Sequence, residues 1–320
     1  MMYRLDPAGN GVRLSIPFGM FFCIMVVFSF CFGCKPGTGV SNPGSSKPVM
    51  VVSILPQQWF VARIAGDRVR IMTLVGPGQN PHSYEPTPKQ MAELAAAQAW
   101  VLSGTEFELP LRPKIEALFP KLRIVDGTAG VSFRSLEVHD EHGETDDASG
   151  IDRHTWLVPK PAKIMAAHIR DALCSLDEPG APVYQENYAV LIQDIDAEFD
   201  VLQEELSPLK GTSVFVYHPS FGYFLDTFGI VQEAIELGGK EPTPRELSGL
   251  IDKARQHGAA AIFVQAQFPV QAARTAAASV GAELIALDPL ALDWLQNIRD
   301  MGAALKNAAT MERTKPEELP

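Results

Sequence analysis

Short apolar runs alternate with longer stretches of helical spacing along the first half of the chain. The runs are rich in β-branched residues and end close to a Gly or Pro, which is typical of buried strands. They cover residues 49–55, 69–75, 99–102 and 123–126, and helical spacing covers 57–66, 87–99 and 106–119. Strands and helices in this order predict βαβ units, in which helices cover both faces of a parallel sheet.

The same alternation returns after Pro208. Strand-like runs cover residues 214–217, 231–237, 260–265 and 283–287. Four strands in each half indicate a structural duplication, although we find no sequence repeat that aligns the two halves. The pattern therefore predicts two α/β lobes, each built on one mainly parallel, four-stranded sheet flanked by helices.

A long helix is predicted between the halves. Residues 161–176 and 182–206 both have helical spacing, and each segment has a proline near its start, where the first helical turn accepts one. The second segment has about 25 residues and would reach roughly 37 Å, which is longer than a small lobe is wide. We expect it to join the lobes rigidly, with an N-terminal lobe over 49–180, the linking helix over 181–206 and a C-terminal lobe over 207–320.

The first 48 residues have the pattern of an export segment. Arg4 and Arg13 precede an apolar run over residues 16–32, which predicts a signal peptide over 1–33. The sequence Cys31-Phe32-Gly33-Cys34 resembles the lipobox of bacterial lipoproteins, with Cys31 in place of the usual leucine, so we expect Cys34 to be acylated. A cleaved signal without a lipid and an uncleaved anchor are the alternatives. Residues 34–48, rich in Gly, Ser and Pro, predict a flexible tether.

Composition and charge narrow the class of protein. The 320 residues carry a formal net charge of -11 and are 46% hydrophobic, as in a globular protein. The negative charge argues against nucleic acid as a partner, because phosphates would be repelled. Cys174 is the one cysteine that remains after the predicted export segment, which rules out an intramolecular disulfide there. We expect the chain to act as a monomer.

Four side chains form the candidate metal site. His82, His154, His218 and Asp288 each stand at or just beyond a predicted strand end or before a predicted helix, two in each half. In proteins with parallel sheets, bound molecules lie beyond the carboxyl ends of the strands. Three imidazoles and one carboxylate suit a borderline divalent cation. No two of these residues are close in sequence, so spacing alone does not define the site.

The remaining histidines have ordinary interpretations. Residues 139–147 are acidic and contain two histidines, which indicates a solvated loop, with weak collection of metal as the alternative. His168 lies inside a predicted helix and His257 lies at a helix end before Gly258, where structural roles are common.

The segments around the four candidate ligands resemble the metal-specific solute-binding proteins of bacterial ABC transporters, the zinc and manganese family that includes periplasmic zinc-uptake proteins and adhesin-like lipoproteins. Residues 81–88 (PHSYEPTP) are similar to the family's first ligand loop. Residues 154–159 (HTWLVP) resemble its second, with Arg153 and Val158 as departures. Residues 218–224 (HPSFGYF) and 287–289 (LDP) resemble the third and the fourth.

This resemblance implies a site and a role. The ion would lie in the cleft between the lobes, held by His82, His154, His218 and Asp288, and would be delivered to a membrane permease and its ATPase. In this family, a histidine at the third position goes with zinc. Three imidazole nitrogens are also softer ligands than oxygens and favour Zn²⁺ over Mn²⁺. Manganese is the alternative. The location would be extracytoplasmic, either periplasmic or anchored through Cys34.

Two other functions were weighed. A zinc hydrolase with Glu85 as general base is disfavoured, because Pro86 and Pro88 break any helix that would align Glu85 with His82, and no His-Glu-x-x-His motif occurs. A site with four protein ligands leaves no open position for a water, which predicts carriage of the metal and no catalysis. An anchored binder of some other solute, with incidental histidines, is the second alternative.

Overall fold

The computed structural model describes residues 47–136, 150–236 and 243–314. The predicted signal peptide, the tether up to residue 46, Cys34 and the acidic loop over 139–147 lie outside these ranges. The described residues belong to one compact unit that begins at Ser46. Among them, no helix combines the length and the apolar character that crossing a bilayer requires.

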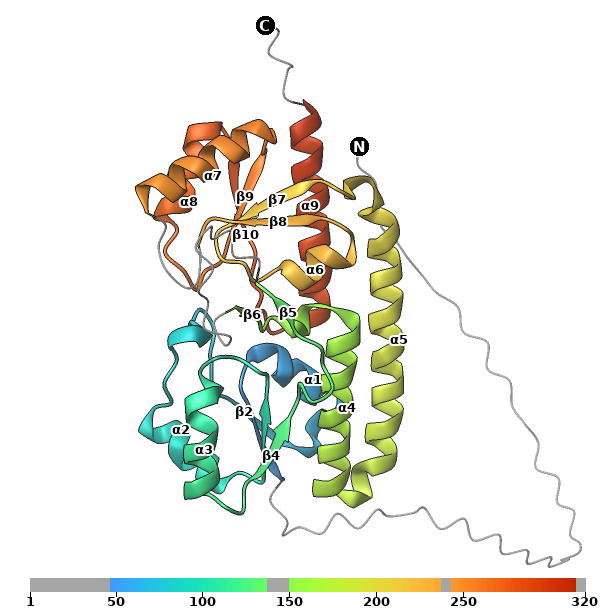
Figure 1. The fold of residues 1–320 in the computed structure, drawn as a ribbon. Helices are drawn as coiled ribbons and strands as arrows, with labels where there is room; N and C mark the ends of the chain where they lie inside the picture. The colour runs from blue at the N-terminus through green and yellow to red at the C-terminus, as the bar shows by residue number, and fades with distance from the viewer. Residues whose placement is uncertain (1–46, 137–149, 237–242, 315–320) are drawn as a thin grey trace, which may run out of the picture. The chain divides into compact units, whose positions relative to one another are not determined.

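The two predicted sheets are present, and all of their strand pairs are parallel (Figure 1). The first has the order β2-β1-β3-β4 and is built from Val49–Val52 (β1), Arg70–Thr73 (β2), Ala99–Leu102 (β3) and Arg123–Asp126 (β4). The second has the order β10-β9-β7-β8 and is built from Ser213–Val216 (β7), Val231–Ala234 (β8), Ala261–Val264 (β9) and Glu283–Ala286 (β10). Numbered within each half, both orders read 2-1-3-4, so the duplication exists in the topology.

Helices flank both sheets, which confirms the predicted fold class. The first sheet is accompanied by Leu55–Ala65 (α1), Pro88–Ala96 (α2), Glu108–Leu118 (α3) and Pro159–Leu176 (α4). The second is accompanied by Gly222–Thr227 (α6), Pro244–Gln256 (α7), Gln271–Val280 (α8) and Trp294–Thr314 (α9). Thr87 and Thr243 begin α2 and α7 as capping boxes, in which the threonine hydroxyl accepts from a backbone N–H one turn later.

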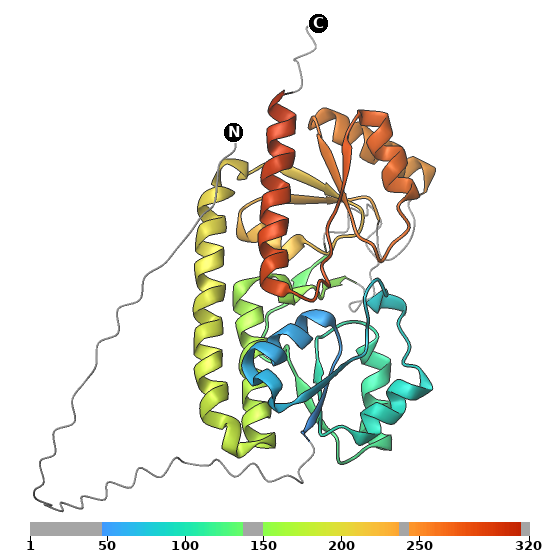
Figure 2. The same cartoon turned by 180° about the vertical axis from the view of Figure 1, so that it is seen from behind.

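The long helix α5 spans Ala181–Glu205, 25 residues, and packs against helices of both halves (Figure 2). Its partners are α1 and α4 on the N-terminal side and α9 on the C-terminal side. Ion pairs follow the same contacts: Asp194 meets Arg63 of α1, and Glu198 meets Arg299 of α9, each at 2.5 Å. A helix fixed to both halves in this way restricts rotation between them.

The halves also share one apolar core. Trp294 of α9 is fully buried, and its ring lies 5.1 Å from that of Phe60 in α1. Its indole N–H donates to the Trp156 carbonyl at 2.7 Å, and the Trp156 indole N–H donates to the Pro289 carbonyl at 2.7 Å. A large apolar interface favours small rearrangements over a wide hinge motion.

Some elements differ from the sequence prediction. The helix α1 begins at Leu55 and not at residue 57, because Pro56 occupies the first turn, where its missing N–H has no helical partner to lose. An antiparallel pair, Arg134–Ser135 (β5) with Ile151–Asp152 (β6), was not predicted. Two residues per strand are too few to show an alternating pattern.

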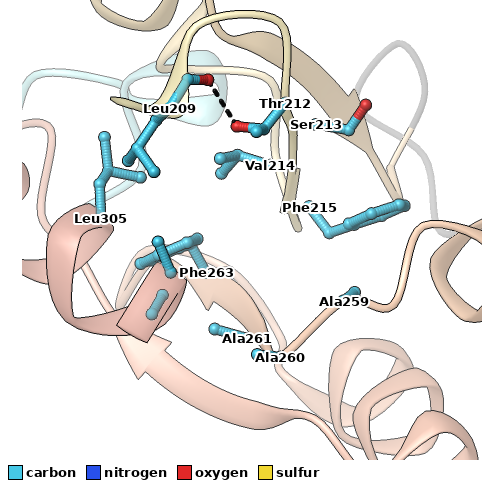
Figure 3. A pocket seen from close by; sticks show the side chains of 12 residues that line it. Leu209, Thr212, Ser213, Val214, Phe215, Ala259, Ala260, Ala261, Phe263 and Leu305 are labelled. Carbon is cyan, nitrogen blue, oxygen red and sulfur yellow. Dashed lines mark hydrogen bonds between the residues drawn. The ribbon is translucent and has the colours of Figure 1, made fainter. Parts of the chain in front are cut away.

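An apolar pocket lies at the amino ends of β7 and β9, beside α9 (Figure 3). Its volume is about 50 Å³, and its lining includes Val214, Phe215, Phe263 and Leu305. The Thr212 hydroxyl at its rim donates to the Leu209 carbonyl at 2.7 Å. None of the lining side chains is charged or is a histidine, so this pocket is not a metal site. It lies at the amino ends of the strands, opposite the loops that carry the candidate ligands.

Candidate metal centre

The three candidate histidines follow strands whose carboxyl ends meet between the two halves. His82 lies in a 3-10 turn, Pro81–Ser83 (η2), in the loop after β2, and Asn80 caps this turn by accepting from the His82 N–H at 2.9 Å. His154 follows β6 and precedes the 3-10 turn Thr155–Leu157 (η3). His218 follows β7 and precedes α6. The prolines near His82 hold that loop stiffly.

These three imidazoles converge on one point. Within the described ranges, His82, His154 and His218 form the group of potential ligands whose donor atoms all lie within 4.8 Å of one another. The Nε2 atoms of His82 and His218 are 3.0 Å apart. Two nitrogens bound to one tetrahedral Zn²⁺ at 2.0–2.1 Å would lie roughly 3.3 Å apart. The spacing of His82 and His218 is therefore within a few tenths of an ångström of what a shared ion requires.

Each histidine is backed by a carboxylate at its other ring nitrogen. Nδ1 of His82 lies 3.2 Å from Glu106, and Nδ1 of His154 lies 2.9 Å from Asp152. Nδ1 of His218 makes a short hydrogen bond to the buried Glu236. A carboxylate at Nδ1 fixes the tautomer and the ring orientation and leaves Nε2 as the donor atom for a metal.

These three carboxylates were not predicted from the sequence. Asp152 stands two positions before His154, while Glu106 and Glu236 follow the carboxyl ends of β3 and β8. The same positional rule that singled out the histidines therefore applies to Glu106 and Glu236. Nothing in the sequence, however, pairs a given carboxylate with a given imidazole.

The electrostatics of the site favour a cation. Burial acts to lower the pKa of His82, but the hydrogen bond and negative charge of Glu106 outweigh it and raise that pKa. Burial acts to raise the pKa of Glu106, and His82 outweighs it and brings the pKa down to about 2. Burial, followed by the neighbouring His154 and His82, lowers the pKa of His218 well below its ordinary value. Without a metal, a proton on His82 Nε2 can therefore be donated to neutral His218.

Asp288 is placed differently from the histidines. It follows β10 as predicted, but it does not belong to the group of donor atoms within 4.8 Å. Its Oδ1 accepts from the Gln267 side-chain amide at 2.7 Å and from the Leu290 N–H at 2.9 Å. Gln267 and Leu290 both line the small cavity at the histidines, so Asp288 is bonded to residues of the cavity wall.

Aromatic and apolar side chains enclose the three imidazoles. The Phe268 ring stacks on His218 with the ring centroids 4.2 Å apart, and the Trp156 ring lies 5.5 Å from His154. The cavity between these groups has a volume of about 10 Å³, so it suits a single small occupant. The side chains of His154 and His218 are 8% and 6% exposed and that of His82 is 25% exposed, so solvent reaches the site beside His82.

The other residues singled out from the sequence lie apart from this centre. His168 is half-buried on α4 and its Nε2 lies 3.0 Å from the Ala129 carbonyl oxygen. His257 follows the last residue of α7. Arg153 donates to the Gly104 carbonyl at 3.0 Å, and Val158 is buried before α4. These two departures from the family pattern therefore leave the Asp152–His154 pair intact. Glu85 is exposed to solvent.

Two α/β halves on a long helix, with three converging imidazoles between them, define a metal-binding protein of the solute-binding class. Residues 50–308 match the sequence profile of the family described as zinc-uptake complex component A, periplasmic (ZnuA). The chain belongs to this family, which confirms the resemblance found in the sequence. The family consists of metal-binding solute-binding proteins of ABC transporters and not of enzymes, which removes the hydrolase alternative.

Individual relatives agree with this assignment. A crystal structure of ZnuA superposes with a TM-score of 0.76 at 34% identity, covering 82% of this chain and 99% of that one. The zinc-binding lipoprotein AdcA of Streptococcus pneumoniae serotype 4 is 27% identical over 75% of this chain and 50% of its own length. The manganese-binding lipoprotein MntA of Halalkalibacterium halodurans is 27% identical over 76% of this chain and 79% of its own length.

Proposed function

We propose that this protein captures Zn²⁺ outside the cytoplasm, binds it with high affinity between its two lobes and delivers it to an ABC permease and its ATPase. The observation that carries the proposal is the convergence of His82, His154 and His218 with a carboxylate behind each ring. Such a centre is built to hold a cation, and burial of two of the three imidazoles separates the ion from solvent.

Zinc is proposed over manganese because of the donor atoms. Three imidazole nitrogens suit Zn²⁺, whereas Mn²⁺ prefers more oxygen ligands. The relatives include one protein named for zinc and one named for manganese, so the choice rests on the site itself. Asp288 is proposed as the fourth ligand, and it must exchange its hydrogen bond with Gln267 for the metal when the ion binds.

The location is part of the same proposal. We infer that residues 1–33 are removed as a signal peptide and that Cys34 carries a lipid, with residues 34–48 as a tether to the membrane. Mass spectrometry of the N-terminal peptide from membrane-purified protein tests this. An acylated Cys34 supports it, and a mature chain that begins at another residue contradicts it.

Metal analysis of protein purified without added metal tests the function. We expect one equivalent of zinc in the wild type, and loss of most of it in His218→Ala, because His218 is central to the cluster. His168→Ala is the matched control, since His168 is a histidine of α4 that lies outside the cluster. Equal metal content in all three proteins would place the ion elsewhere, and metal-free wild type that also fails to take up added Zn²⁺ would end the proposal.

A further inference from the structure

The short β5–β6 hairpin of the N-terminal lobe contacts helix α6 of the C-terminal lobe through a polar cluster. Four residues form it, and we call it the interlobe clamp: Arg134 of β5, Asp152 of β6, and Tyr223 and Asp226 of α6. Arg134 and Asp152 are directly opposite each other in the hairpin. The clamp therefore joins two segments that are far apart in the sequence.

The Tyr223 hydroxyl bridges the main chains of the hairpin. It accepts a hydrogen bond from the Arg134 backbone N–H at 2.8 Å and donates one to the Asp152 backbone carbonyl at 3.1 Å. Burial raises the pKa of Tyr223, so the hydroxyl keeps the proton that it donates. One side-chain oxygen of the C-terminal lobe thus takes part in the pairing of two strands of the N-terminal lobe.

The Arg134 guanidinium adds charged contacts. Its Nη1 lies 2.5 Å from Asp226, and its Nε lies 3.7 Å from Oδ2 of Asp152. The guanidinium carbon lies 5.7 Å from the centroid of the Tyr223 ring, within cation–π range. The first carboxylate belongs to the C-terminal lobe and the second to the N-terminal lobe, so one cation holds an anion on each side.

Glycine at position 222 permits this close approach. A Cβ atom built at Gly222 would lie 2.5 Å from Nη1 of Arg134 and 3.0 Å from Oδ2 of Asp152. Any larger residue would have to displace the Arg134 guanidinium or move α6 away from the hairpin.

The clamp lies directly between two candidate metal ligands. Oδ1 of Asp152 accepts from the His154 backbone N–H at 3.0 Å and lies 2.9 Å from Nδ1 of the same residue. On the other side, Tyr223 follows His218 by five positions, and α6 starts within that interval. The path from His154 to His218 through the clamp therefore consists of Asp152, then Arg134 and Tyr223, then the first turn of α6.

We propose that Tyr223 and Arg134 are positioning residues that set the placement of His154 relative to His218 across the lobes, and that they thereby control how fast the metal is released. The proposal rests on the function proposed above. Two imidazoles from different lobes can share an ion only if the lobes are held in register. The clamp is a polar contact that crosses between the lobes, is bonded to His154 through Asp152 and touches no metal itself.

The test uses residues 46–320, the compact unit, without the export segment. The crystallised ZnuA chain aligns over 99% of its length with only 82% of this chain, so relatives fold without the remainder. The variants are Tyr223→Phe, which removes both main-chain bonds, and Arg134→Gln, which removes the charge contacts. Tyr188→Phe is the matched control, because the Tyr188 ring is also paired with an arginine, Arg170, at 4.3 Å.

Zinc dissociation is measured by stopped-flow with a chromogenic chelator, and affinity by competition. We expect Tyr223→Phe and Arg134→Gln each to release zinc about tenfold faster, the size expected when support of a ligand is lost. The visible spectrum of bound Co²⁺ should also change, because it reports ligand geometry. Arg134→Lys should release zinc at a rate between those of the wild type and Arg134→Gln, because lysine retains the positive charge but not the planar guanidinium.

The outcomes separate the two proposals. Release rates and Co²⁺ spectra equal to those of the wild type and Tyr188→Phe overturn the clamp while leaving metal binding in place. Lower unfolding temperature of the metal-free variants, with unchanged release, also overturns it, because the cluster then acts on stability alone. A wild type that binds no zinc overturns the proposed function itself.

Discussion

His82 and His218 are separated by 136 positions, and their Nε2 atoms face each other at 3.0 Å. Both rings present Nδ1 to a carboxylate, which favours the tautomer with a proton on Nδ1. Two unprotonated Nε2 atoms at this distance would repel each other. A proton or a metal ion between them removes this repulsion, and the two compete for the same place.

This competition predicts that zinc binding releases a proton when the pH is below the raised pKa of His82. The pKa of His82 is raised above 6.5, so its proton is present below that raised value and must leave before Nε2 can bind a metal. The affinity for zinc should thus be constant at high pH. It should fall as the pH decreases through the raised pKa of His82, which lies above 6.5. Calorimetric titrations in buffers of different ionisation enthalpy measure the proton directly. A binding constant that stays flat from pH 7.5 to 5 contradicts the prediction.

The carboxylate behind His218 can be removed without changing the ligands. Glu236→Gln keeps the size of the side chain but cannot hold the imidazole tautomer through a charged acceptor, so we expect a loss of about 10- to 100-fold in zinc affinity. The control is Glu233→Gln on the preceding strand β8, where Glu233 pairs with Lys253 at 2.6 Å. Competition with a chelator of known affinity measures both. Equal losses in the two variants would mean that the effect is general to buried acids.

The part played by Asp288 can be tested through metal preference. If its carboxylate becomes the fourth ligand, Asp288→Asn should weaken zinc binding and should weaken manganese binding more, because Mn²⁺ depends more on oxygen donors. Asp293→Asn is the control, since Asp293 accepts from the Gln296 N–H at the start of α9. Affinities for both ions that match those of the wild type would exclude Asp288 from the coordination sphere.

The shared core between the lobes should dominate stability. Trp294 is fully buried against Phe60 and donates a hydrogen bond to the Trp156 carbonyl, so Trp294→Ala is expected to cost about 3–5 kcal/mol of unfolding free energy. Chemical denaturation of the metal-free protein measures this loss. A change below about 1 kcal/mol would indicate that the lobes are stabilised independently of this contact.

The elements that position the site were predictable from the sequence because each strand is a short apolar run that ends at a turn. His82 and His218 were found by the same reasoning, since parallel strands deliver the residues after their carboxyl ends to one edge. His154 was found because it stands before a predicted helix. The convergence of all three was not predictable from spacing. It came from the family resemblance and required both sheets to have the same strand order.

What the sequence did not reveal depends on side-chain geometry. The pairing of Glu106 with His82 and of Glu236 with His218 joins residues of different strands, and no local pattern encodes it. The β5–β6 hairpin was missed because its strands are two residues long. Asp288 lies where the sequence placed it along the chain, but its bond to Gln267 depends on a loop conformation that periodicity does not describe.

X-ray absorption at the zinc edge, on protein loaded with one equivalent of Zn²⁺, tests the central claim most directly, because multiple scattering from imidazole rings counts the histidines around the ion. We predict three imidazole nitrogens and one oxygen at about 2.0–2.2 Å. A spectrum with one imidazole or none would contradict the claim that His82, His154 and His218 share a single metal.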